Sequence, residues 1–134
     1  MSAMSTYLEN ALVNHVLRNT ALATPGTTIY VGLIKFYETT KLEPGTLTQE
    51  MSGSSYARIQ VTAWDAPSDG ATQNTGAITF AAASANWGMI SGVIVSDHAT
   101  AGNVLLHGSL TTARDVNNGD VFKFNAGDLD ITFA

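Results

Sequence analysis

Residues 87–97 read Trp-Gly-Met-Ile-Ser-Gly-Val-Ile-Val-Ser-Asp, and this stretch decides the fold. At its centre, Val93, Ile94 and Val95 are consecutive β-branched residues, which favour an extended backbone over a helix. Apolar side chains fall on both parities of the run, a pattern typical of a strand covered on both faces. We therefore predict that this stretch is a central strand, that Trp87 anchors the core, and that a polar turn follows over residues 97–103.

The composition bounds the classes of function. The chain has 134 residues, which predicts a single domain over residues 1–134. It has no cysteine, and therefore no disulfide or thiolate metal site. A net charge of −5 argues against a nucleic-acid partner, which needs a basic face. No apolar run approaches the roughly 20 residues of a membrane span, and residues 1–6 do not resemble a secretory signal.

One helix is predicted, over residues 7–18. Thr6 and Glu9 have the spacing of a capping box at its start. Apolar residues then recur at helical spacing and predict one face that packs on the core. That face comprises Leu8, Leu12, Val13, Val16 and Leu17.

About seven to eight extended segments follow, separated by turns, with no alternation of strands and helices. This pattern is typical of an antiparallel β-sandwich, and we predict an all-β, jelly-roll-like fold. Residues 88–96 and 103–110 are predicted to form a hairpin, and residues 121–124 and 129–133 a terminal one. The other segments are residues 27–36, which follow a Pro25-Gly26 turn, and residues 56–64, 77–80 and 111–116.

Residues 37–55 show no periodicity and predict a long polar loop, a feature that is often functional. Residues 56–64 alternate, which predicts a half-exposed strand with Ile59 and Val61 on one face and Arg58 on the other. We expect Arg58 and Arg114 to pair with Asp65 or Asp115 on the surface, or to contact a partner protein.

No constellation for catalysis is visible, and we predict neither an enzyme nor a cofactor or metal site. His15, His98 and His107 have no metal-ligand spacing and are predicted to lie on the surface or at the core edge. Asp128 and Asp130 lack further calcium ligands and fit a solvated strand edge. An aromatic platform for sugars is the remaining alternative, and it would use Tyr30, Tyr37, Tyr56, Trp64 and Trp87.

Several motifs run in one order along nearly the whole chain. They include Tyr-Leu-Glu-Asn-Ala-Leu at residues 7–12, Trp-Gly at residues 87–88 and Asn-Val-Leu-Leu-His-Gly-Ser-Leu at residues 103–110. Phe-Asn-Ala-Gly-Asp-Leu follows at residues 124–129. In order and spacing, these motifs resemble a family of small structural proteins of tailed-bacteriophage virions.

The resemblance implies a structural protein of the virion, without a catalytic motif. We expect a capsid decoration or cement protein that binds the assembled major capsid protein shell and stabilises it. The alternative is a small tail-fibre or tail-tip component that takes part in host recognition. Because virion parts are symmetric, we expect a homo-oligomer, either a dimer or a trimer, with no nucleic-acid or membrane partner.

The polar loop and the turn after the central strand are the expected contact elements, since a loop can become ordered on an interface. The predicted partner contacts are Tyr37, Glu38, Lys41, Glu43, Glu50, Arg58, Asp97 and His98.

Overall fold

The computed structural model describes residues 3–22 and 29–133. The predicted Pro25-Gly26 turn and the first two residues of the predicted strand 27–36 lie outside the described residues. In chain order the elements are β1 (Ala3–Met4), α1 (Thr6–Leu17), β2 (Tyr30–Ile34), α2 (Thr39–Leu42), β3 (Ile59–Gln60), β4 (Ala71–Gln73), β5 (Ile78–Thr79), β6 (Gly88–Ser96), β7 (Val104–Val116), β8 (Lys123–Phe124) and β9 (Asp130–Thr132).

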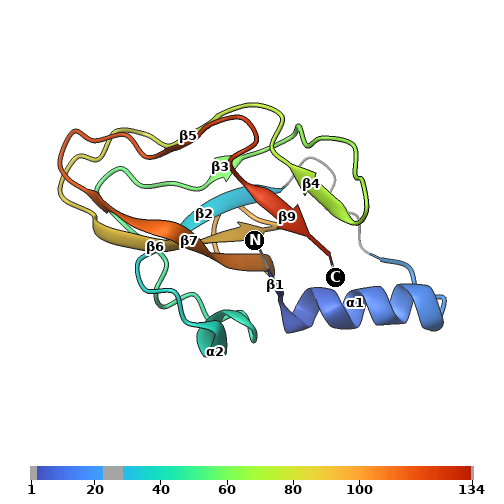
Figure 1. Ribbon diagram of the computed structural model, residues 1–134. Coiled ribbons are helices and arrows are strands. Elements are labelled where there is room, and N and C mark those ends of the chain that lie inside the picture. The colour runs from blue at the N-terminus through green and yellow to red at the C-terminus, as the bar shows by residue number, and fades with distance from the viewer. Residues whose placement is uncertain (1–2, 23–28, 134) are drawn as a thin grey trace.

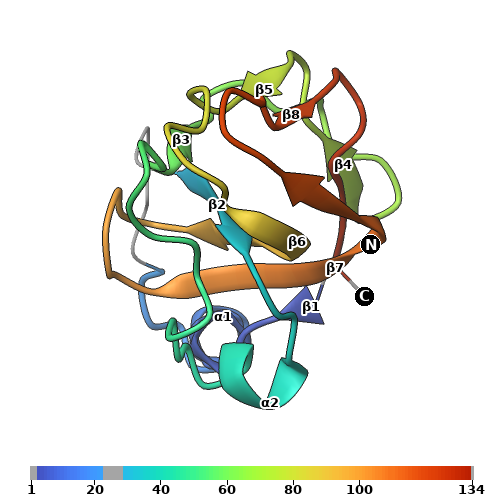
Figure 2. The same ribbon diagram turned by 90° about the vertical axis from the view of Figure 1, so that its left-hand side faces the viewer.

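The largest sheet has five strands in the order β1-β7-β6-β2-β3, and all neighbours are antiparallel. β6 lies at its centre, between β2 and β7 (Figures 1 and 2). Residues 92–96 of this strand are all buried, on both parities. The prediction of a central strand covered on both faces is therefore confirmed.

β6 and β7 form the predicted hairpin, with Val93 opposite Gly108 and Ile94 opposite His107. β7 is 13 residues long, so the segments predicted separately at residues 103–110 and 111–116 are one strand. β7 stays paired with β6 across a break in register, since Ile90 pairs with Arg114 and Gly92 pairs with Ser109. The four residues 110–113 of β7 therefore lie opposite a single residue of β6, Ser91. A bulge of this kind keeps a strand paired while it changes direction.

Two small antiparallel sheets, β4–β9 and β5–β8, lie over one face of the large sheet (Figure 1). The predicted terminal hairpin is therefore wrong, because Phe124 pairs with Ile78 and Ile131 pairs with Thr72. Alternation shows that a segment is extended and which side chains share a face, but it does not specify a distant pairing partner. The fold is β-rich and sandwich-like, as predicted.

The main core fills the space between these layers. Val31, Leu33 and Val93 from the large sheet belong to one buried cluster with Phe80 and Phe122 from the second layer. Trp87 belongs to the same cluster and is 1% exposed. Its Nε1 donates to the carbonyl of Ser54 at 2.9 Å, and its ring meets that of Tyr56 edge to face. Trp87 is therefore a core anchor, as predicted.

The opposite face of the large sheet carries a smaller cluster of Ile34, Leu42, Ile94 and Val104. Leu42 comes from α2, which lies below the sheet in the view of Figure 1. The segment predicted as a long polar loop, residues 37–55, therefore contains a short helix. It also contributes buried apolar side chains to both clusters. The sequence did not predict this, because single apolar residues at irregular spacing leave no periodic signal.

The predicted N-terminal helix is present as α1, with a different start and a different face. Its N-cap is Ser5 rather than Thr6, and the Ser5 hydroxyl accepts a hydrogen bond from the amide of Leu8. Only Leu8 is buried, whereas Val16 and Leu17 are 72% and 78% exposed. The prediction that the whole apolar stripe packs on the core is wrong, because only the first turns of α1 lie against the sheet.

Candidate functional site

Arg58 is a buried cation that joins three segments of the chain. Its Nε and Nη2 donate to the two carboxylate oxygens of Glu50 at 2.7 and 2.8 Å. Its Nη1 lies 3.0 Å from Ser96 Oγ and 2.7 and 2.9 Å from the carbonyl oxygens of His98 and Ala101. Arg58 therefore fixes the turn after β6 against the segment that carries Glu50.

The prediction that Arg58 is a surface residue is wrong. Its side chain is 2% exposed, because residues 56–64 form a strand only at β3 and Arg58 lies beside it under the turn. Burial is the largest single effect and opposes the charged form. Hydrogen bonding and charge attraction to Glu50, together with Tyr56, outweigh burial and raise the pKa of Arg58 above its ordinary value. Burial and the neighbouring Glu50 raise the pKa of Tyr56, whose hydroxyl donates to Glu50 Oε1 at 2.8 Å.

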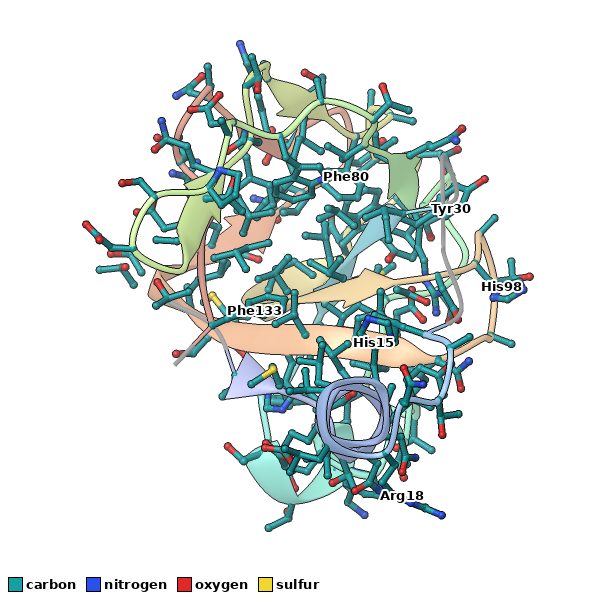
Figure 3. The ribbon with its side chains drawn as sticks, turned by 90° about the vertical axis from the view of Figure 1, so that its right-hand side faces the viewer. His15, Arg18, Tyr30, Phe80, His98 and Phe133 are labelled. Atoms are coloured by element: carbon teal, nitrogen blue, oxygen red, sulfur yellow. The ribbon has the colours of Figure 1, made fainter. Side chains whose placement is uncertain are left out.

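The turn over residues 97–103 is closed by Asp97. One carboxylate oxygen of Asp97 accepts from the backbone amide of Asn103 at 2.7 Å and lies 2.7 Å from His98 Nδ1. The other accepts from Asn103 Nδ2 at 2.9 Å. Partial burial raises the pKa of Asp97, but these hydrogen bonds outweigh it and hold that pKa below its ordinary value. His98 lies at the periphery of the molecule in Figure 3 and is exposed.

A second polar network lies on the α2 side of the large sheet. The Tyr37 hydroxyl lies 2.9 Å from His107 Nδ1, and His107 Nε2 lies 3.0 Å from Glu43 Oε1. His107 is 1% exposed. Tyr37 packs so closely on Gly92 that a Cβ there would lie 2.9 Å from its ring. This network ties the segment around α2 to β6 and β7.

The remaining predicted contacts lie outside these two networks. Glu38 is exposed and accepts a hydrogen bond from Gln49 Nε2 at 2.6 Å, while Lys41 is exposed on α2. The eight predicted contact residues thus do not converge on one site, and their role in partner binding stays a prediction. Sequence reasoning missed the internal role of Arg58, Glu50, Tyr37 and Glu43, because buried polar residues in irregular segments resemble solvated ones.

The predicted ion pairs of Arg58 and Arg114 with Asp65 or Asp115 are wrong. Arg58 pairs with Glu50 instead, and the Arg114 guanidinium stands 5.8 Å from the centre of the Phe122 ring. Among residues 3–22 and 29–133, no three or more His, Asp or Glu side chains form a group that could hold a metal ion. Within the same ranges, no helix is long and apolar enough to cross a membrane.

Residues 3–132 match a protein-family model described as Podophage GP4 fiber I protein gp80. The match begins at the first residue of β1 and ends at the last residue of β9, so it covers every described element. The chain belongs to the gp80 family. It is therefore a structural protein of a bacteriophage virion, as the resemblance implied. None of the curated proteins compared with this gp80-family chain matches it.

For a gp80-family protein, which associates with other virion proteins, exposed apolar side chains are informative. Besides Tyr7, α1 carries three of them at a spacing of three and four residues, namely Val13, Val16 and Leu17, which are 53%, 72% and 78% exposed. Figure 3 looks along α1 and shows it at the margin of the molecule, with Arg18 at the outside. These three side chains form the exposed apolar surface of α1. The helical spacing was visible in the sequence, but the short overlap between α1 and the sheet was not.

Proposed function

We propose that this chain is a building block of a virion fibre, held in place by contacts with other virion proteins. The observation that carries the proposal is the match to a fibre-protein family over residues 3–132. Because the match includes both clusters of the core and both polar networks, it concerns the whole folded unit rather than a shared motif.

The exposed apolar surface of α1 supports an attachment role. Val13, Val16 and Leu17 contribute nothing to the described core, so burying them against a neighbouring virion protein adds stabilisation without disturbing the fold. The neighbour is another fibre protein or a second copy of the chain, in a dimer or a trimer. Burial of apolar surface is the main driving force of most such contacts.

The predicted contacts from the polar loop and the turn have a complementary role in this proposal. Exposed Glu38, Lys41 and His98 supply polar contacts at the margin of an interface, where such residues are common. Arg58 holds the turn that carries His98, and Glu43 helps to hold α2.

A second candidate is the capsid decoration protein expected from the sequence, which binds the major capsid protein shell. It is favoured by the absence of any repeat in the sequence of the kind that builds a fibre shaft. A small β-sandwich of this kind suits binding at many equivalent places on a shell.

Cryo-electron microscopy tests the two proposals. The virions carry an epitope-tagged copy of this chain and are decorated with an antibody fragment that binds the tag. We expect added density at the tail, in the symmetry of the fibres. Density spread regularly over the capsid shell would overturn the fibre proposal and support the decoration role. Untagged virions treated with the same fragment give the control map.

A further inference from the structure

A hollow of about 290 Å³ opens between the second half of β7 and the β8 region. β8 and β7 come from different layers of the fold, as Figure 2 shows. This volume is at the lower end of the roughly 300–1,000 Å³ of small-ligand pockets. The hollow is lined by Leu110, Thr111, Thr112, Arg114, Phe122, Lys123, Phe124 and Asp128.

Arg114 and Lys123 give the hollow two positive charges, against one negative charge from Asp128. Among the ion pairs of the described residues, none includes either side chain. The chain as a whole carries a net charge of −5. Attraction of an anion to this place is therefore a local property of the hollow and not a consequence of the overall charge.

Phe122 orients one of these cations. The Arg114 guanidinium lies 5.8 Å from the centre of the Phe122 ring, and that ring is itself 3% exposed in the core. A guanidinium held over an aromatic face keeps its N–H donors at the ring edge available, and these donors match phosphate and carboxylate oxygens in pairs. Arg114 is thus positioned as a receptor for an anionic group.

The rest of the lining favours a sugar over a bare anion. Asp128 is exposed in the same hollow, and its negative charge repels a small inorganic anion. Its carboxylate accepts hydrogen bonds from hydroxyl groups, and the hydroxyls of Thr111 and Thr112 both donate and accept. Leu110 adds an apolar wall for the C–H face of a ring.

We propose that this hollow binds an acidic sugar, with its phosphate or carboxylate group on Arg114 and Lys123 and its hydroxyls on Thr111, Thr112 and Asp128. Phosphorylated sugars and uronic acids share this chemistry. The proposal goes beyond the role in the virion and is independent of it, because the isolated chain binds the sugar whether it belongs to a fibre or to the shell.

The test is a titration of the full-length, isotope-labelled chain followed by the chemical shifts of its backbone amides. The probes are a glucose phosphate, galacturonic acid, glucose and inorganic phosphate. We expect saturable shifts confined to residues of the hollow for the two acidic sugars, with much weaker binding of glucose and of phosphate. Binding of only one acidic sugar supports the proposal and identifies whether phosphate or carboxylate is the recognised group.

Two results overturn the proposal. One is that neither acidic sugar shifts the amide signals of residues in the hollow. The other is binding of inorganic phosphate as tight as that of the glucose phosphate, which makes the hollow a simple anion site. A failure here leaves the cryo-electron microscopy of tagged virions unaffected, so the two proposals fail separately.

Matched variants assign the binding to the named side chains. Arg114→Gln and Lys123→Gln each remove one positive charge at an exposed position, and each is expected to raise the dissociation constant about tenfold. Arg18→Gln removes the same charge at the exposed C-cap of α1, away from the hollow, and is expected to leave binding unchanged. Equal losses from all three variants would contradict the proposal.

Discussion

Arg58 and Glu50 form a bidentate ion pair in the interior, with 2.7 Å between Nε and Oε1 and 2.8 Å between Nη2 and Oε2. The remaining guanidinium nitrogen holds the turn between β6 and β7 through the carbonyl oxygens of His98 and Ala101. A single buried cation thus links the β6–β7 hairpin to the segment that follows β2.

Replacing Arg58 with Ala should destabilise the protein by about 3–5 kcal/mol, because it leaves the Glu50 carboxylate without its cationic partner. Urea unfolding measures the loss. Arg18→Ala, at the exposed C-cap of α1, is the control and should change stability by less than about 0.5 kcal/mol. In a double-mutant cycle with Glu50→Ala, additive effects of the two substitutions would contradict a direct pair.

Asp97 should make the stability depend on pH in the acid range. Its pKa is lower in the folded state than in the unfolded chain, so its contribution is present above the unfolded value of roughly 3.9. The contribution is lost as the pH falls through the folded value. We expect it to be at most about 1 kcal/mol, because the turn is partly open to solvent.

Urea unfolding of the natural protein and of Asp97→Asn, from neutral to strongly acid pH, measures the contribution of Asp97 to stability as the difference between the two proteins. The difference should shrink as the pH falls below about 4. A difference that stays constant over the whole range would rule out Asp97 as its source.

Trp87→Ala should cost about 3–5 kcal/mol, the usual range for a buried aromatic residue. The change empties a site between Tyr56 and the core and removes the hydrogen bond to the Ser54 carbonyl. Trp87→Phe keeps most of the apolar contact and should cost less. A thermal melt in which Trp87→Ala matches the natural protein would disprove its role in the core.

Val13→Ser combined with Leu17→Ser should leave the stability within about 1 kcal/mol, since both side chains are exposed, and should reduce incorporation into virions. Quantitative immunoblots of purified particles measure incorporation, and urea unfolding checks the fold. Leu8→Ala is the contrasting variant, because Leu8 is the buried residue of α1 and its loss should act through stability. Full incorporation of the doubly substituted chain would exclude this surface from attachment.

The sequence was most informative where the pattern was local and continuous. The apolar run at residues 93–95 predicted a central strand, and the turn beside it predicted the β6–β7 hairpin, because strands joined by a short turn pair with each other. The terminal hairpin failed for the opposite reason. Phe124 and Ile131 each pair with a residue from the middle of the chain, and no local sequence pattern specifies such a distant pairing.

The polar residues, too, were predicted poorly where their surroundings depend on distant parts of the chain. Alternation around Arg58 predicted an exposed side chain, but the segment is regular only at β3, and the turn after β6 covers Arg58. The hollow beside Arg114 depends on two strands from different layers, so its members are scattered over residues 110–128. Their spacing in the sequence therefore did not predict a shared hollow.

The anchorage of α1 has a consequence for the order of folding. β1 pairs with His107 and Leu106, the Ser5 amide donates to the carbonyl of Leu105, and the Ser5 hydroxyl bonds to that of Val104. Contacts between residues so far apart in the chain are slow to form. During synthesis α1 leaves the ribosome before β7 does, and it can dock on the sheet only after β7 has been made. Leu8, the buried side chain of α1, thus stays exposed on the nascent chain until β7 is available.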